Sequence, residues 1–343
     1  MKKRNNSQFQ RLHDKLPILV ICAALFFLLI IWIADDDSTT EELCEEVIRV
    51  DNRSDFAYLF LLSSNSYFPC LSVAIYSLQK TETKWDIVVL MTNNIWENIE
   101  SSLKEMGVIV VRIDGIKNPN KKIKRTHLTD NYTKLRAWQL IDYRKIIYSD
   151  SDFLYVRNSD DLAYLPGDVN AGRNFASKTG EWPDENFFCA GFMVVTPSSD
   201  AFCSLIKKSS EFESATGGDQ PFQNWFWAGK WNEIQYKIDA ANANIFLSRR
   251  EEWEADKVRS IHFTRFTNPC NQHNVEFVSE FFNNFEENYA AGNPLGLWLH
   301  TKNNLLLEYP QFVPLFEECG FLKGWTDTGK AAATQVYHPI GFV

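Results

Sequence analysis

Runs of apolar residues separated by segments with helical spacing predict alternating strands and helices over most of this chain. Uninterrupted apolar runs of strand length occupy residues 56–64, 85–93 and 108–114, and helical spacing occupies residues 67–79 and 95–107. Apolar runs without polar alternation are typical of strands that are covered on both faces. The pattern therefore predicts an α/β domain with a mainly parallel sheet flanked by helices.

A further helix is expected at residues 132–143, and it leads into a strand at 145–152 that contains Asp150 and Asp152. Side chains at positions i and i+2 of an extended chain point the same way, so the two carboxylates are expected to face one side. An isolated pair of this kind is more often a solvated turn. However, like charges so close repel unless a cation lies between them, and the carboxyl ends of parallel strands are where such sheets bind ligands. This position therefore predicts a divalent metal site.

The N-terminal region contains one long apolar segment, residues 16–34, which carries no charge. At ~1.5 Å per residue a helix of this length spans roughly 28 Å, about one hydrocarbon thickness. Basic residues precede it and acidic residues follow it, which favours a cytosolic tail at 1–15, a luminal stem at 35–54 and a luminal catalytic domain at 55–343. A cleaved signal peptide is the alternative, although its apolar region is usually shorter.

Composition and charge narrow the class of protein further. The net charge of −9 argues against non-specific binding to nucleic acid, and the hydrophobic content of 45% is that of a folded chain. Of the seven cysteines, Cys22 falls in the apolar segment; the other six could pair, in a connectivity that spacing does not reveal. Glycosylation sequons begin at Asn52 and Asn131, as expected for a luminal glycoprotein.

Five blocks of sequence, in the same order along the chain, resemble the family-8 retaining glycosyltransferases, the group that includes glycogenin and galactinol synthase. The blocks are AYLFLLSSNSY, TKLRAWQLIDYRKIIYSDSDFLYVRNSDDL, FFCAGFMVVTPS, GGDQPFQNWF and IHFTRFTNP. The resemblance implies a single nucleotide-diphospho-sugar transferase domain of the GT-A type. It also implies a UDP-sugar donor and a metal ion that stabilises the charge of the departing diphosphate.

The resemblance assigns roles to individual residues. The metal ligands it implies are Asp150, Asp152 and His262, a donor set that favours Mn²⁺ over Mg²⁺. The donor-binding residues it implies are Ser63, Tyr67, Arg125, Lys134 and Gly191, and Arg265 is added to them as a departure from the family pattern that supplies a positive charge for the phosphates. The catalytic residues it implies are Asp219 and Gln220, which either orient the donor sugar or include a transient nucleophile.

Three departures from the family pattern affect the expected sugar pocket. Cys189 and Ala190 stand where the family commonly has Asn-Ser, so a polar side chain is absent. A phosphate-binding lysine is replaced by Asn268, with Arg265 nearby as a substitute positive charge. Thr216 stands where glycogenin-like sequences have an aspartate. The identity of the donor sugar is therefore open.

Together these features predict a single-pass type II enzyme of the Golgi membrane, or alternatively of the endoplasmic reticulum. It is expected to transfer a sugar to glycans on luminal glycoproteins. N-acetylglucosamine is the first expectation, as in membrane-anchored fungal members of the family that resemble N-acetylglucosaminyltransferases, and glucose or galactose the next. The alternative is a catalytically inactive glycan-binding protein on the same fold. Residues 272–343 are expected to add helices that pack on the sheet, or to build the acceptor side of the cleft.

Overall fold

The computed structural model describes residues 40–120, 129–174, 186–214, 217–264, 267–270 and 293–321. The chain divides into two compact units, residues 1–47 and 48–343. The described part of the first unit contains a helical segment at residues 40–45. Within the described ranges no helix is both long and apolar enough to cross a membrane, and the expected span at 16–34 lies outside these ranges.

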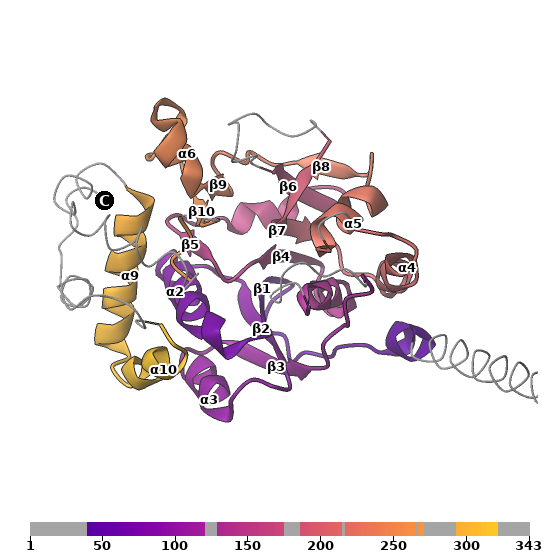
Figure 1. The fold of residues 1–343 in the computed structure, drawn as a ribbon, viewed down its shortest axis with the longest axis horizontal. Helices are drawn as coiled ribbons and strands as arrows, with labels where there is room; N and C mark the ends of the chain where they lie inside the picture. The colour runs from indigo at the N-terminus through magenta and orange to yellow at the C-terminus, as the bar shows by residue number, and fades with distance from the viewer. Residues whose placement is uncertain are drawn as a thin grey trace, which may run out of the picture. The chain divides into compact units, whose positions relative to one another are not determined.

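The second unit is built around a seven-stranded sheet with the strand order β3-β2-β1-β4-β7-β6-β8 (Figure 1). Its strands are β1 (Phe56–Leu62), β2 (Asp86–Thr92), β3 (Ile109–Ile113), β4 (Lys145–Ser149), β6 (Val169–Arg173), β7 (Phe188–Val195) and β8 (Trp231–Glu233). Strands β3, β2, β1 and β4 run parallel, whereas β7 is antiparallel to both β4 and β6. The expected mainly parallel sheet is thus confirmed, and β2 is buried at every position, as a strand covered on both faces should be.

A second sheet has three strands in the order β5-β10-β9. They are β5 (Phe153–Tyr155), β9 (Ala241–Asn242) and β10 (Ser260–His262). Strand β10 pairs antiparallel with β5, in a register that sets His262 opposite Phe153. This pairing brings a late segment of the chain next to the end of β4.

Helices and 3-10 turns cover the two sheets. The helices are α2 (Phe68–Lys80), α3 (Glu97–Glu105), α4 (Ser199–Ser209), α5 (Asp219–Phe226), α6 (Ala243–Ser248), α9 (Pro294–Glu308) and α10 (Phe312–Glu318). The 3-10 segments are η1 (Asn65–Tyr67), η3 (Asn131–Gln139), η4 (Asp160–Tyr164) and η5 (Arg250–Glu252). The helices expected from sequence at 67–79 and 95–107 correspond to α2 and α3.

The C-terminal helices α9 and α10 lie beside one another in Figure 1, and both pack on α2. The sequence had predicted that helices in this region would pack on the sheet. The ring centroid of Phe68 lies 5.6 Å from that of Phe312 and 5.9 Å from that of Phe316. At the other end of α2, the Tyr76 hydroxyl donates a hydrogen bond to Glu308 at 2.9 Å. Helix α2 also contacts β5 and β1 and is buried along most of its length, so α9 and α10 form an outer layer over it.

Two local expectations were wrong. The segment expected as an α-helix at 132–143 is the 3-10 segment η3, where buried Arg136 donates from Nε to the Asp114 carbonyl at 2.7 Å. The expected strand at 145–152 ends at Ser149, because the backbone then leaves one sheet for the other. Asp150 N still donates to Gly191 O of β7 at 2.9 Å, whereas Asp152 O already accepts from Phe263 N, which follows β10.

Candidate metal and donor site

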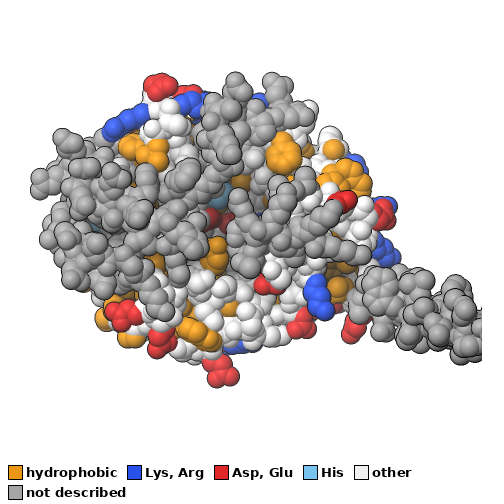
Figure 2. Space-filling model, viewed as in Figure 1, with side chains coloured by type: hydrophobic (Ala, Val, Ile, Leu, Met, Phe, Trp, Pro, Cys, Tyr) orange, Lys and Arg blue, Asp and Glu red, His pale blue; other side chains and the backbone are white. Residues whose placement is uncertain are grey.

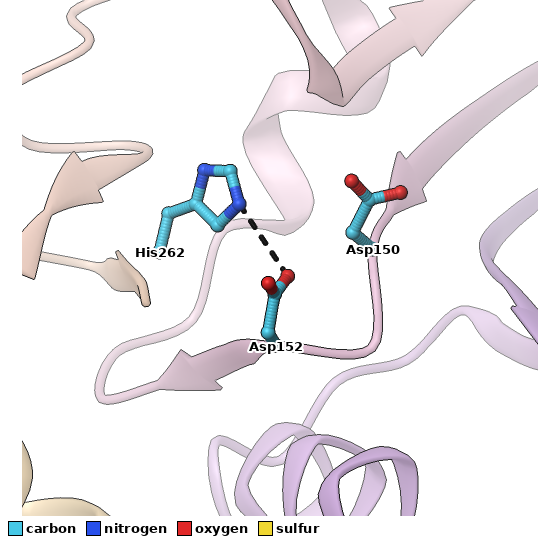
Figure 3. A group of neighbouring side chains, drawn as sticks. All are labelled: Asp150, Asp152 and His262. Carbon is cyan, nitrogen blue, oxygen red and sulfur yellow. Dashed lines mark ion pairs between the residues drawn. The ribbon is translucent and has the colours of Figure 1, made fainter. Parts of the chain in front are cut away.

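Asp150, Asp152 and His262 converge at the point where β4 ends and the second sheet begins (Figure 3). Each offers a ligand atom, and these atoms all lie within 4.8 Å of one another. The two aspartates face the same space because the chain turns between β4 and β5, not because they share one strand face. The geometry expected from the sequence is therefore reached by a different local conformation.

Asp150 is held in place through one of its two carboxylate oxygens. Its Oδ1 atom accepts a hydrogen bond from the Tyr148 hydroxyl at 2.8 Å and lies 3.3 Å from Lys134 Nζ. Its other oxygen, Oδ2, faces Gly191: a Cβ atom added there would lie 2.8 Å from Oδ2 and 2.9 Å from His262 Cε1. The absent side chain of Gly191 thus leaves open the space between two candidate ligands.

In Asp152 and His262, as in Asp150, one polar atom contacts a neighbouring residue and the other polar atom faces the space between the candidate ligands. Asp152 Oδ2 accepts from Asn268 Nδ2 at 2.8 Å, while Oδ1 lies 3.4 Å from His262 Nε2. That Oδ1 atom is buried and has no hydrogen-bond partner among the described residues. On the far side of the imidazole, Nδ1 lies 3.8 Å from the Cys189 sulfur, and the ring stacks on Phe153 at 4.3 Å between centroids.

This arrangement fits a divalent cation. Asp152 Oδ1 accepts no well-formed hydrogen bond and has His262 Nε2 as an ion-pair neighbour at 3.4 Å, so a metal ion bound by both groups would satisfy this buried oxygen. Burial is the largest influence and would lower the pKa of His262, but the charges and hydrogen bonds of Asp152 and Cys189 together outweigh burial and raise that pKa to about 10. Without a metal ion the imidazole therefore carries a proton at neutral pH, and a bound cation would take that proton's place between His262 and Asp152.

A buried charge cluster adjoins these ligands. Lys134 Nζ lies 3.3 Å from both Asp150 Oδ1 and Asp219 Oδ2, and its side chain is only 9% exposed. Burial disfavours the charged amine, but Asp150 and Asp219 together raise the pKa of Lys134 well above its usual value. Burial in turn raises the pKa of Asp219, although Lys134 opposes the shift. Lys134 thus forms ion pairs with both Asp150, a candidate metal ligand, and Asp219, an expected catalytic residue.

Helix α5 supplies the two expected catalytic residues from its first turn. Both oxygens of Asp219 are engaged: Oδ1 accepts from Asn131 Nδ2 at 2.7 Å, and Oδ2 accepts from Gln223 Nε2 at 2.7 Å. Gln220 Oε1 accepts from the backbone N–H of Ala190 at 3.0 Å. The start of α5 is therefore fixed against the part of β7 that also carries Gly191.

Of the expected donor-binding residues, Lys134 and Gly191 lie next to the candidate ligands, and Tyr67 lies within electrostatic range of Asp152 and Asp150. Burial raises the pKa of Tyr67 to about 12, with further contributions from the charges of Asp152 and Asp150. Ser63 lies in the loop after β1, where its carbonyl accepts from Asn94 Nδ2 at 3.1 Å. Arg125 and Arg265, together with Thr216, lie outside the described residues.

Two neighbours of the candidate ligands were not expected from the sequence. Cys189 was noted only as a missing polar side chain, yet its free thiol faces His262 Nδ1. Asn268 was noted only as a missing phosphate contact, yet it donates to Asp152. Both positions differ from the family pattern, and this difference was the only sign in the sequence that they contact the candidate ligands.

The site is visible from one face of the molecule. Figure 2 shows red and pale-blue side chains, acidic and histidine respectively, close together near the centre of that face. A cavity borders Cys189 and His262, and β6, β7 and residues 236–245 supply its other walls. Of the three candidate ligands, His262 lines this cavity.

The sequence of this chain is similar to those of known glycosyltransferases. The family described as "Glycosyl transferase family 8" matches residues 58–269. UDP-glucuronate:xylan alpha-glucuronosyltransferase 2 of Arabidopsis thaliana is 32% identical over 184 residues, 53% of this chain and 29% of that protein. Glycogenin-1 of Caenorhabditis elegans is 26% identical over 248 residues, 68% of this chain and 55% of that protein. The chain spans 24% to 37% of the length of its plant xylan-glucuronosyltransferase relatives.

Solved structures agree on the fold. The glycosyltransferase GlyE of Streptococcus pneumoniae superposes with a TM-score of 0.51 at 16% identity, covering 74% of this chain and 63% of that one. The bifunctional glycosyltransferase WbbM in its apo form gives a TM-score of 0.51 at 18% identity, covering 73% of this chain and 52% of that one.

Proposed function

Because the chain belongs to glycosyl transferase family 8, we propose that it transfers a sugar from a UDP-sugar to a glycan acceptor with retention of anomeric configuration. The observation that carries the proposal is the convergence of Asp150, Asp152 and His262, each with one atom held by the protein and one atom facing the shared space. Such a site is suited to a cation that also binds the diphosphate of a donor.

The metal ion we propose is Mn²⁺, held by Asp150 Oδ2, Asp152 Oδ1 and His262 Nε2. One imidazole and two carboxylates are a donor set that suits Mn²⁺. When bound, the ion would offset the negative charge that develops on the diphosphate as the glycosidic bond breaks. Tyr67, beside both aspartates, offers an aromatic face for the uracil ring.

On the sugar side, we propose that Asp219 and Gln220 orient the donor rather than attack it. Both Asp219 oxygens already accept hydrogen bonds, and Lys134 lies 3.3 Å from one of them. A carboxylate so engaged is a weakened nucleophile, which favours transfer on one face of the sugar with the leaving phosphate accepting the proton. Gln220 accepts from Ala190 through Oε1, so its amide nitrogen is the group that can donate to a sugar hydroxyl.

The donor sugar is the part of the proposal that depends most on relatives. Several relatives bear the name UDP-glucuronate:xylan alpha-glucuronosyltransferase, and one bears the name glycogenin. We therefore propose UDP-glucuronate and UDP-N-acetylglucosamine, the donor expected from the sequence, as the first two donors to test. UDP-glucose and UDP-galactose follow.

We further propose that the enzyme acts in the lumen of the Golgi or endoplasmic reticulum on glycans of glycoproteins, behind a membrane anchor at residues 16–34. The disulfide between Cys70 and Cys270 supports an oxidising compartment, since disulfides are rare in the cytosol.

The test is UDP release by the full chain with each of these donors and UDP-xylose, first with Mn²⁺ and then with a chelator. Chelator-sensitive release from one donor, lost in Asp152→Ala, is the expected result. If the protein binds Mn²⁺ and UDP but releases no UDP from any donor with any acceptor of a glycan array, the result would instead favour an inactive glycan-binding protein. The replaced Cys189 and Ala190 positions are the observation behind that second candidate.

A further inference from the structure

Asn268 connects a candidate metal ligand to the chain that follows β10. Its Nδ2 atom donates to Asp152 Oδ2 at 2.8 Å, and its Oδ1 atom accepts from the backbone N–H of Cys270 at 2.8 Å. The second bond closes a short turn and thereby fixes the direction of the amide group. Asn268 is therefore oriented by its own backbone before it contacts Asp152.

The turn that carries Asn268 is anchored at both ends. On one side, the Thr267 backbone and hydroxyl donate to Thr264 O at 3.2 and 2.9 Å, next to β10. On the other side, Cys270 is joined to Cys70 of helix α2 by a disulfide across 200 residues of sequence. Helix α2 begins directly after Tyr67, so the disulfide ties this turn to the helix that follows that residue.

The contact fixes the orientation of the Asp152 carboxylate at the candidate metal site. With Oδ2 bound to Asn268, Oδ1 is directed toward His262 Nε2 at 3.4 Å, and it is the buried atom without a hydrogen-bond partner. Rotation of the carboxylate would break the bond to Asn268. The amide thus selects one orientation of a ligand that would otherwise have several.

From these contacts we infer that Asn268 and the Cys70–Cys270 disulfide form a clamp that positions Asp152 for metal binding. The inference rests on the proposed metal-dependent function and adds two positioning elements to it. Partners that orient a ligand from outside the coordination shell commonly change metal affinity by about 10–100-fold when removed. The clamp also gives a role to the position where the family pattern places a phosphate-binding lysine.

The experiment is a Mn²⁺ titration of the full chain, followed by the signal of free Mn²⁺ in electron paramagnetic resonance. Asn268→Ala is expected to weaken Mn²⁺ binding by about tenfold or more. Asn268→Ser keeps an acceptor for the Cys270 N–H but loses the donor to Asp152, so it should show the same loss.

Asn158→Ala is the matched control. Asn158 makes the same kind of turn, accepting from Asp160 N at 2.9 Å and donating from Nδ2 to Thr81 O at 3.1 Å, but it touches no candidate ligand. Its Mn²⁺ affinity should equal that of the wild type. Melting temperatures of the metal-free proteins separate a positioning effect from a loss of fold: Asn268→Ala should melt close to Asn158→Ala.

The disulfide is tested by Cys70→Ser/Cys270→Ser, and by phosphine reduction of the folded protein should that variant not fold. Either change should lower Mn²⁺ affinity in the wild type and add nothing in Asn268→Ala, because both act through one chain of contacts. Wild-type affinity in Asn268→Ala, or a disulfide effect that adds in full to it, would overturn the inference. Absence of Mn²⁺ binding in the wild type, or unchanged binding in Asp152→Ala, would overturn the proposed function instead.

Discussion

Gly191 lies so close to Asp150 that any side chain at position 191 would collide with the Asp150 carboxylate. Gly191 O accepts a hydrogen bond from Asp150 N at 2.9 Å, and a Cβ atom at Gly191 would lie 2.8 Å from Asp150 Oδ2. Atoms so close would have to move apart, and Oδ2 is the oxygen that faces the metal site. The glycine is thus required by the ligands and not by a turn in the backbone.

Gly191→Ala is therefore expected to weaken Mn²⁺ binding by about 10–100-fold, since the new methyl group displaces Asp150 and the His262 ring. A Mn²⁺ titration measures the effect. Gly115→Ala is the control, because a Cβ atom there would meet its nearest neighbours at an ordinary 3.6 Å. Equal affinities in the two variants would contradict the assignment.

Metal binding is expected to strengthen with rising pH. The pKa of His262 in the metal-free fold, about 10, lies above its ordinary value of 6.5. The imidazolium–Asp152 pair therefore stabilises the metal-free protein fully below the ordinary value, and this contribution is lost as the pH rises toward 10. A metal ion must displace the proton, so Mn²⁺ affinity should rise by about tenfold per pH unit from about pH 7 to 9.

Isothermal titration in buffers of different ionisation enthalpy measures that proton release directly. Wild-type protein should release close to one proton per Mn²⁺ at neutral pH, and His262→Gln should release almost none. A pH-independent affinity in the wild type would mean that His262 is already neutral before the metal binds.

Lys134→Met should destabilise the fold by about 3–5 kcal/mol, because it leaves Asp150 and Asp219 without their shared buried cation. Chemical denaturation of the metal-free protein measures the change. Lys104→Met, which removes an exposed pair with Glu100, should cost only about 0.3–0.5 kcal/mol. Addition of Asp219→Asn to Lys134→Met should restore part of the loss, and no recovery would argue against charge as the cause.

Cys189→Ala should reduce Mn²⁺ affinity by about tenfold by removing the partner of His262 Nδ1, whereas Cys189→Ser should retain most of it. The serine hydroxyl still accepts from Nδ1–H and so keeps Nε2 available for the metal. A Co²⁺-loaded sample provides a second reading: a sulfur-to-cobalt charge-transfer band would show that Cys189 is a ligand and not a positioning residue.

The sheet and the helices α2 and α3 could be predicted from the sequence because unbroken apolar runs and helical spacing are local signals. The 3-10 conformation of η3 could not be predicted, because its contacts include the hydrogen bond from Arg136 to the carbonyl of Asp114, which lies after β3 and is distant in sequence. The turn at Asp150–Asp152 was hidden for a similar reason: β4 and β5 pair in different sheets, and pairing partners are not encoded locally.

In the candidate site too, some residues could be predicted from the sequence and others only from the structure. Asp150, Asp152 and His262 were found from motif order, and the structure brings them together. The roles of Cys189 and Asn268 depend on contacts across 73 and 116 residues of sequence, which no spacing rule supplies. The sequence showed only that both positions differ from the family pattern.

The register between β4 and β7, in which Ser149 lies opposite Phe192, has a consequence for how folding of this domain can be monitored. Continued by one position, it places Gly191 against Asp150, and a slip by a single residue would bring Ala190 or Phe192 there instead. Either side chain would fill the space that Gly191 leaves open. Capacity to bind a divalent ion is therefore a test of strand alignment, and it would distinguish correctly registered molecules from compact misfolded ones in a purified preparation.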